Sequence, residues 1–303
     1  MTLEQVKMLK LVVEEESLKA AGERIHKTQA AVSQGIKQLE SHLGIQLFDR
    51  NQYRLCLTPE GERVYQVGLA LLEKADEIER LCKHFNEGNE SSITLTFDVA
   101  FDLNLVLDVL EELQDKFPET QTIIRQEYIT GALDSLNRGE ADIVITPVVG
   151  ATLYQQQYES FLLSQNGAIK VASPTLLARH PGLQSVKELE KEYQIIVQDT
   201  GTGTKGVTYN VEDGQRRWYV NDVETKKKLI LRGLGWGSFS THMIADEVKS
   251  GALKKLELLD SITDIKLNHY AIKSRGKLLG PVARYLWESL NALAEGEHGL
   301  NQA

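Results

Sequence analysis

The sequence predicts a multidomain α/β protein, in which short helices and one long helix precede a region of alternating strands and helices. The first observation is the length, because 303 residues exceed a typical single domain. The second is that apolar residues recur at helical spacing as far as residue 88. The third is that short apolar runs and helical patterns alternate from residue 93 onward, which is typical of a largely parallel sheet.

The composition indicates a protein with packed cores that does not enter a membrane. Hydrophobic residues make up 42% of the chain and charged residues 25%, as in ordinary globular proteins. No window approaches the roughly 18 consecutive apolar residues of a membrane span. The N-terminus lacks a basic segment followed by an apolar one, so we expect no signal peptide. Cys56 and Cys82 cannot form a disulfide framework, which indicates the cytoplasm.

The first sixty residues predict three short helices followed by a small β-wing. The first helix carries apolar residues at positions 3, 6, 9 and 13. Ser17 is the expected N-cap of the second helix, and Gly44 is the glycine that ends the third. The third helix begins after Thr28. Two short strands, at 47–48 and 53–57, form the wing.

The second and third helices have the features of a helix-turn-helix. Ala20 and Ala21 are small enough for the two helices to cross closely, and residues 25–28 form a short turn. The second helix of such a motif inserts its N-terminal turn into the major groove, where glutamine can hydrogen-bond an adenine edge. The expected DNA contacts are Thr28, Gln29, Ala30, Ser33, Gln34 and Lys37 on the helix, with Arg50 and Arg54 flanking the wing.

Charge leaves open an alternative to DNA binding, namely a polar helix face that is only solvated. The chain has a net charge of −9, and residues 1–60 contain eight basic and eight acidic side chains. Since DNA affinity needs a local basic surface, this balance counts slightly against DNA binding.

Residues 58–88 predict one long helix. Val64, Leu71, Ile78 and Phe85 are seven residues apart, with a second partial seam at positions 67, 75 and 82. Such a narrow apolar stripe needs a partner helix, so we expect a homodimer through this helix. The alternative is packing against the rest of its own chain. Residues 87–92 form the linker that follows.

The remaining residues alternate between strands and helices. Strands are expected at 93–99, 122–128, 141–146, 169–172, 195–198 and 269–272. Helices are expected at 103–117, 132–137, 223–232, 241–249 and 281–295. A region of this length fits two small lobes better than one.

Four N-terminal segments together resemble the signature of LysR-type transcriptional regulators. They are SLKAA at 17–21, QAAVSQGIKQLE at 29–40, LGIQLFDR at 43–50 and LTPEG at 57–61. Weaker similarity follows at 117–118, 136–145, 233–237 and 251–253. Three positions depart from the expected pattern. Ala30 and Ser240 stand where the family often has proline, and Gly35 interrupts the recognition helix, on a side that we expect to lie close to DNA.

The resemblance implies an architecture and a set of partners. It implies a winged helix-turn-helix at 1–60, a linker helix and hinge at 61–90, and an effector-binding domain at 91–303 built like a type 2 periplasmic binding protein. Lobe I would comprise 92–165 and 268–303, and lobe II 166–267. The partners implied are promoter DNA, a small-molecule effector, RNA polymerase and further copies of the chain, as a homodimer and homotetramer.

Ligands of such sheets bind outside the carboxyl ends of the strands. The residues expected there are Ala100, Phe101, Asp102, Ile129, Thr130, Pro147, Asp199, Thr200, Thr202, Thr204 and Ser240. The hydroxyl-rich run 200–204 could hold a carboxylate, or be only a flexible surface turn. Asp102 would repel an anionic effector if it pointed inward.

Other functions are less favoured by the sequence. The seven histidines never pair at metal-ligand spacing, and no cofactor motif or nucleophile–base set indicates an enzyme. A solute-binding transport protein would not need the first 90 residues. We expect Lys226, Lys227 and Lys228 to form a solvated helix face, residues 216–218 to form a surface strand, and Trp236 to lie in the core.

Overall fold

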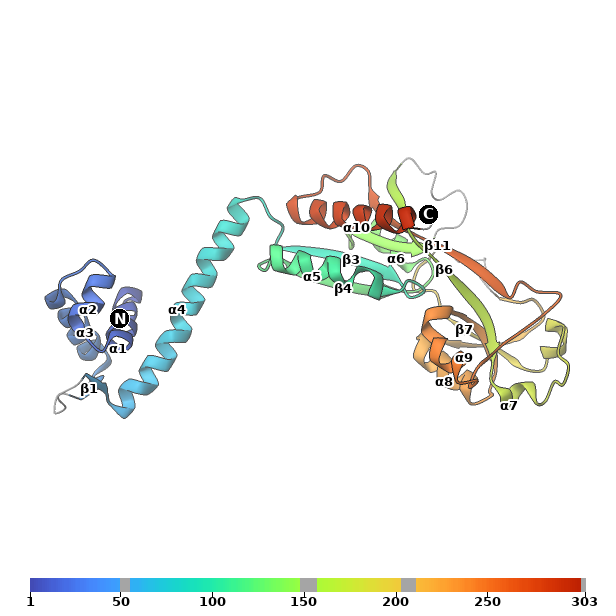
Figure 1. Ribbon diagram of the computed structural model, residues 1–303, viewed down its shortest axis with the longest axis horizontal. Coiled ribbons are helices and arrows are strands. Elements are labelled where there is room, and N and C mark those ends of the chain that lie inside the picture. Colours follow the sequence, from blue (N-terminus) through green and yellow to red (C-terminus); the bar gives the residue numbers. More distant parts are fainter. Residues whose placement is uncertain (50–54, 148–156, 203–210, 301–303) are drawn as a thin grey trace. The chain divides into compact units, whose positions relative to one another are not determined.

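The structure, a computed structural model, describes residues 1–49, 55–147, 157–202 and 211–300, with only the backbone of 297–300. The chain forms two compact units, Met1–Glu87 and Gly88–Ala303 (Figure 1). None of the helices in the described ranges is both long and apolar enough to cross a lipid bilayer.

The N-terminal unit consists of three short helices, a hairpin and a long helix. The short helices are α1 (Leu3–Glu15), α2 (Leu18–Arg24) and α3 (Gln29–Leu43). Each helix is preceded by a residue whose side-chain hydroxyl accepts a backbone N–H of the first turn. These N-cap residues are Thr2, Ser17 and Thr28. The antiparallel strands β1 (Phe48–Asp49) and β2 (Cys56–Leu57) form the wing, and α4 (Pro59–Asn86) follows. The core contains Met8, Leu9, Val12, Ala21, Val32, Ile36, Leu39, Leu47 and Phe48.

A close backbone contact joins the wing to α4. Gly61 lies in the first turn of α4, and a Cβ atom there would lie 2.9 Å from the carbonyl carbon of Leu47. Thr58 caps α4, and its hydroxyl also donates to the carbonyl of Gln46 at 2.8 Å. The wing therefore packs directly against the first turn of α4.

A mixed sheet of nine described strands runs through the C-terminal unit in the order β4-β3-β5-β11-β6-β9-β7-β8, with β10 paired to β6. β3 is parallel to β4 and β5, and β7 is parallel to β8 and β9, whereas β11 is antiparallel to β5 and β6. The strands are β3 (Ser92–Asp98), β4 (Gln121–Glu127), β5 (Ile143–Pro147), β6 (Tyr158–Ala172), β7 (Tyr193–Val197), β8 (Arg216–Val220), β9 (Trp236–Ser240), β10 (Lys254–Lys255) and β11 (Asp264–Ser274).

Separate hydrophobic cores divide this unit into two lobes. Lobe I carries α5 (Leu107–Lys116), α6 (Gly131–Asn137) and α10 (Pro281–Leu300), with apolar side chains of β3 and β5 at its centre. Lobe II carries α7 (Pro174–Leu177), α8 (Val223–Leu231) and α9 (Ala245–Lys249), with cores on β7, β9 and the end of β6. The described ranges also contain the 3-10 turns η1 (Leu103–Val106), η3 (Val186–Leu189) and η4 (Thr241–Ile244). The long strands β6 and β11 run between the lobes (Figure 1).

Most predicted elements are confirmed, but the sheet is mixed rather than largely parallel, because β6 and β11 run antiparallel to their neighbours. β11 extends well beyond the expected strand at 269–272, and β10 and α7 have no expected counterpart. β6 is far longer than the expected strand at 169–172 and begins at Tyr158. β9 has no counterpart among the expected strands, because Gly237 weakens the strand pattern when it is considered in isolation. The expected helices at 103–117 and 241–249 both begin as 3-10 turns. The predicted surface strand at 216–218 is part of β8, and Trp236 is fully buried.

Candidate functional site

The N-terminal part of α3 is exposed and polar. It exposes five of the expected DNA contacts: Thr28, Gln29, Ala30, Gln34 and Lys37. Ser33 is half-buried. The Thr28 hydroxyl accepts the backbone N–H of Ala31 at 3.2 Å, and its own proton can still be donated to a phosphate. Arg50 and Arg54 lie outside the described residues.

Two glycines determine how α3 is held against the helices beneath it. Ala21 is fully buried at the crossing, as expected, but Gly22 makes the closer contact, because a Cβ atom there would lie 2.7 Å from the carbonyl oxygen of Lys27. Gly35 faces inward against the sulfur of Met8. The expectation that Gly35 lies close to DNA is therefore wrong, since its missing side chain makes room for α1.

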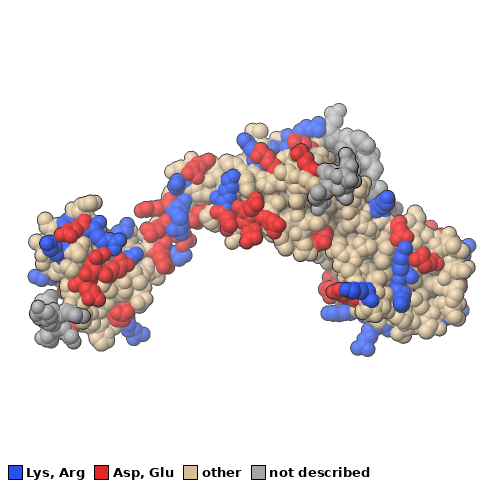
Figure 2. Space-filling view, in the orientation of Figure 1, with Lys and Arg blue, Asp and Glu red and all other residues tan. Residues whose placement is uncertain are grey.

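Most basic side chains in the described part of this unit form ion pairs within it. Six pair with glutamates: Lys10, Lys19, Arg24, Lys27, Lys74 and Lys83. Figure 2 accordingly shows basic and acidic side chains intermixed on this unit. Lys37 forms no ion pair with a described residue and is exposed, so it is available to a DNA phosphate.

An apolar stripe along α4 is left exposed by the described residues. Val67 is 72% exposed, Ile78 62% and Phe85 49%. An apolar groove adjoins the start of this stripe and is lined by α1, α3 and α4, through Met1, Val6, Leu9, Leu39, Leu43, Arg63, Val64, Val67, Gly68 and Leu71. Exposed apolar surface of this kind marks an interaction site.

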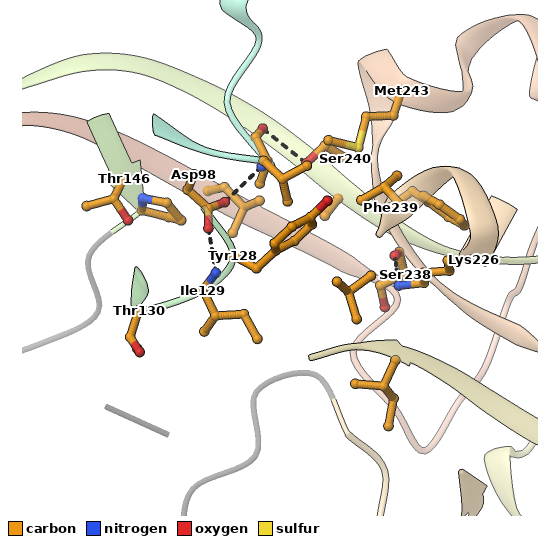
Figure 3. A pocket seen from close by; sticks show the side chains of 18 of the residues that line it. Asp98, Tyr128, Ile129, Thr130, Thr146, Lys226, Ser238, Phe239, Ser240 and Met243 are labelled. Atoms are coloured by element: carbon orange, nitrogen blue, oxygen red, sulfur yellow. Dashed lines mark hydrogen bonds between the residues drawn. The ribbon is translucent and has the colours of Figure 1, made fainter. Parts of the chain in front are cut away.

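In the C-terminal unit, a cavity of about 280 Å³ lies between the lobes, at the carboxyl ends of the parallel strands (Figure 3). Five of the expected effector residues line it: Ala100, Ile129, Thr130, Pro147 and Ser240. Most of the remaining wall is apolar, with Val99, Leu133, Ile195, Ile196, Val197, Val223, Phe239, Met243 and Leu267.

Other expected effector residues do not line this cavity. Phe101 is 2% exposed, and its ring packs edge-on against that of His269, with 5.6 Å between the centroids. The Asp102 carboxylate caps η1 by accepting the N–H of Asn104 at 3.1 Å and does not line the cavity, so it does not point inward. Sequence could not show this, because the direction of a loop side chain is set by its packing. Thr204 lies outside the described residues.

The loops 128–134 of lobe I and 199–202 of lobe II are hydrogen-bonded to each other, and we call these contacts the inter-lobe latch. The Asp199 carboxylate accepts both the N–H of Thr130 at 3.0 Å and its hydroxyl at 2.7 Å. Two further pairs complete the latch: the N–H of Tyr128 with the hydroxyl of Thr200 at 2.9 Å, and the N–H of Thr202 with Asp134 at 2.6 Å.

The latch changes the role of the hydroxyl-rich run. Asp199, Thr200 and Thr202 do not line the cavity, because their polar groups bind lobe I. The loops approach so closely that a Cβ atom at Gly201 would lie 2.6 Å from the carbonyl carbon of Thr130. The described part of the run, residues 200–202, therefore joins lobe II to lobe I.

Asp98 organises the lobe I side of the cavity, although the sequence did not single it out. Its carboxylate accepts the N–H groups of Ala100 at 2.8 Å and Ile129 at 2.7 Å (Figure 3). Burial raises the pKa of Asp98 to about 7, against these two hydrogen bonds, and the charge of Asp199 adds to the rise. Ile129 has a φ of 59°, which is unusual for a β-branched residue, so Asp98 holds a strained turn in place.

Lys226 lies on the lobe II side of the cavity, and the expectation of a solvated lysine face is wrong for this residue. Its side chain is buried, while Lys228 is exposed and Lys227 pairs with Glu247 at 3.1 Å. The Lys226 ammonium donates to the carbonyl of Ser238 at 2.6 Å and lies 4.8 Å from the centroid of the Phe239 ring. Burial lowers the pKa of Lys226 to about 8.

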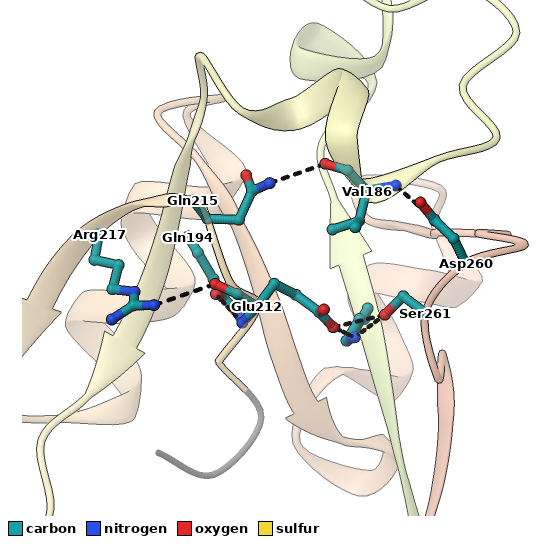
Figure 4. Close-up of polar contacts among 8 residues, drawn as sticks. Val186, Gln194, Glu212, Gln215, Arg217, Asp260 and Ser261 are labelled. Carbon is teal, nitrogen blue, oxygen red and sulfur yellow. Dashed lines mark hydrogen bonds and ion pairs between the residues drawn. The ribbon is translucent and has the colours of Figure 1, made fainter. Parts of the chain in front are cut away.

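A second buried lysine of lobe II has a complete set of partners. Lys170 contacts the Glu212 carboxylate and the Ser261 hydroxyl, and Ser261 donates to Glu212 at 2.6 Å (Figure 4). Burial acts to raise the pKa of Glu212, but the hydrogen bonds from Lys170 and Ser261 outweigh it and hold the pKa below its usual value. Because the pair is satisfied, it serves packing within lobe II.

Two family descriptions match the chain in the order of its two units. Residues 3–62 match the bacterial regulatory helix-turn-helix protein, lysR family. Residues 86–295, more than half of the chain, match the LysR substrate binding domain. The chain belongs to the LysR family. It is a LysR-type transcriptional regulator, with a DNA-binding helix-turn-helix and an effector-binding C-terminal domain.

The similarity to other transcriptional regulators extends over most of this chain and most of each relative. The uncharacterized HTH-type transcriptional regulator YeeY of Escherichia coli K12 is 29% identical over 262 residues, covering 83% of this chain and 81% of YeeY. The probable HTH-type transcriptional regulator YhaJ of the same strain is 27% identical over 259 residues, covering 84% of this chain and 85% of YhaJ. Full-length LysG of Corynebacterium glutamicum, solved with the effector Arg, shares the fold with a TM-score of 0.51 at 20% identity, over 97% and 98% of the two chains. These relatives are transcriptional regulators rather than enzymes.

Proposed function

We propose that this LysR-type regulator contacts promoter DNA through the exposed start of α3. The exposed polar turn carries this proposal, because its backbone N–H groups and side chains are those a major groove accepts. Gln29 and Gln34 would contact base edges, and Lys37 would contact a phosphate. The full set is Thr28, Gln29, Ala30, Ser33, Gln34 and Lys37, with Arg50 and Arg54 from the flanks of the wing.

We infer that α4 forms a homodimer, and that dimers associate into a homotetramer on DNA. The exposed stripe of Val67, Ile78 and Phe85 and the adjoining apolar groove support the dimer, since a second copy of α4 would remove both from water. A dimer also presents two recognition helices to two half-sites of a pseudo-palindromic operator.

We propose that the effector is a small molecule that occupies the cavity between the lobes and contacts Ala100, Ile129, Thr130, Pro147 and Ser240. The position of the cavity at the carboxyl ends of the strands supports this site. The effector shifts the regulator only as far as it prefers one arrangement over another. The shift would alter how RNA polymerase gains access to the promoter, in the cytoplasm.

The domain boundaries that accompany this proposal are 1–60, 61–90 and 91–303. The division of the chain at Glu87 and Gly88 supports a hinge within the second segment. The separate cores support lobe I at 92–165 with 268–303 and lobe II at 166–267.

Selection from a random double-stranded DNA library with the purified full-length protein tests the α3 assignment. The wild type should enrich one sequence. Gln29→Ala should bind that sequence more weakly by about 1–3 kcal/mol and accept other bases at one position. Gln66→Ala, at an exposed site on α4, is the matched control and should bind as the wild type does. If Gln29→Ala enriches the same sequence with unchanged affinity, α3 does not read the operator as proposed.

A further inference from the structure

Among the described residues of lobe II, the buried lysines Lys170 and Lys226 differ in one respect that points to a ligand. Lys170 has the carboxylate of Glu212 and the hydroxyl of Ser261 as partners. Lys226 has only the carbonyl of Ser238 and the face of an aromatic ring among the described residues. An ammonium has three N–H donors, and a buried charge without a counter-ion is unfavourable. Lys226 is therefore an incomplete site, whereas Lys170 is complete.

The carboxylates near the cavity do not complete it. Asp98 faces the cavity from lobe I, but its two oxygens accept the backbone N–H groups of Ala100 and Ile129. Asp199 is engaged by Thr130 in the latch. Burial alone accounts for the lowered pKa of Lys226, with no contribution from a carboxylate.

Ser238 supplies a second unsatisfied donor at the cavity wall. Its hydroxyl oxygen is buried and has no hydrogen-bond partner within the described ranges, and the residue lines the same cavity as Lys226 (Figure 3). Buried hydroxyls in native proteins nearly always have a partner. An ammonium with N–H donors still unused and a hydroxyl without a partner match the needs of a carboxylate.

We propose that the cavity binds a small organic monocarboxylate with an apolar body, whose carboxylate pairs with Lys226 and Ser238. The inference rests on the proposed role of this cavity as the effector site and names the chemical class of its ligand. The apolar wall formed by side chains such as Ile195, Val223 and Phe239 would contact the body of the ligand. A volume of about 280 Å³ equals roughly nine water-sized groups, which is the size of benzoate or hexanoate.

Titration calorimetry of the full-length protein tests this with benzoate and hexanoate as probes, and with benzamide and hexanamide as uncharged probes of the same shape. The wild type should bind each carboxylate at least tenfold more tightly than its amide. Lys226→Met should abolish that preference while the amides still bind. Lys228→Met removes an exposed lysine two residues away and should keep the wild-type preference, so it is the matched control.

A measurement on the wild type keeps the test independent of any variant. Raising the pH from 7 to 9 deprotonates Lys226 and completes the ionisation of Asp98, so benzoate binding should weaken at least tenfold while benzamide binding stays unchanged. Equal affinity for benzoate and benzamide, a preference that survives in Lys226→Met, or no binding of either carboxylate overturns the proposal. Binding of the amides alone would refute the ligand class but keep the cavity as an effector site. None of these outcomes bears on the proposed DNA contacts of α3, which DNA selection tests separately.

Discussion

Replacing Gly201 with alanine should open the inter-lobe latch. A Cβ atom at this position would lie 2.6 Å from the carbonyl carbon of Thr130 and 2.7 Å from the backbone nitrogen of Gly131. Both are backbone atoms, which cannot move aside as a flexible side chain can. The two loops must therefore separate, and the hydrogen bonds between Thr130 and Asp199 must lengthen or break.

The magnitude follows from the bonds that are lost. Thr130 makes two hydrogen bonds to the Asp199 carboxylate, at 3.0 and 2.7 Å. Hydrogen bonds to a charged group contribute about 1.5–3 kcal/mol each, and the lower value applies here because both residues are only part-buried. If both hydrogen bonds are lost, the latch is weakened by about 3 kcal/mol. The amide hydrogen of Thr130 should then exchange faster by roughly two orders of magnitude.

Hydrogen–deuterium exchange of the full-length protein measures this effect at the amides of Tyr128 and Thr130. Gly276→Ala is the matched control, because a Cβ atom there meets nothing within 4 Å. The amide of Leu256, bonded to the carbonyl of Lys170 at 2.9 Å, should exchange at the wild-type rate in both variants. Wild-type exchange at Thr130 in Gly201→Ala, or equal acceleration in Gly276→Ala, would refute the latch.

Three further predictions concern packing, assembly and pH. Gly61→Ala should destabilise the N-terminal unit by about 1–3 kcal/mol, because its Cβ atom would collide with the wing backbone. Gly296→Ala, in open space within α10, should instead stabilise the protein by about 0.5–1 kcal/mol. Urea unfolding measures both changes, and a wild-type unfolding midpoint for Gly61→Ala would contradict the contact. Ile78→Glu should shift sedimentation from dimer toward monomer, while Gln66→Glu on the same helix should not, and an intact Ile78→Glu dimer would exclude this seam. Because the pKa of Asp98 is raised, the folded state keeps a proton that the unfolded state releases. Between pH 5 and 8 the free energy of unfolding of the wild type should therefore fall by about 3 kcal/mol relative to that of Asp98→Asn, with most of the fall below pH 7. Parallel pH profiles of the two proteins would contradict this.

The elements of the fold could be predicted largely from local pattern, because caps and periodicity act within a few residues. Thr28 and Gly44 bound α3 as expected. β6 could not be predicted over its length, because its polar and glycine residues, such as Gln165 and Gly167, are held in a strand by the neighbours β11 and β9 rather than by their own propensity.

The cavity shows the same limit at the level of single side chains. A general rule about strand ends placed residues such as Thr130 and Ser240 at its wall, but it could not show that Phe101 turns into the core. A run of three lysines predicts a solvated face, and only the packing of α8 on β9 determines that Lys226 is the buried member. Asp98 was missed because its role depends on loops that are distant in the sequence.

The pairing of β6 with β11 also has a consequence for how the chain folds. The partners Ile169 and Asp264, and Tyr158 and Ser274, are roughly one hundred residues apart. Joining them from an unfolded chain requires closing a long loop, which has an entropic penalty and slows folding. The segment between them forms lobe II, which has its own cores. If that segment folds first, it brings the two strands together, so lobe II acts as a folding template for the assembly of lobe I.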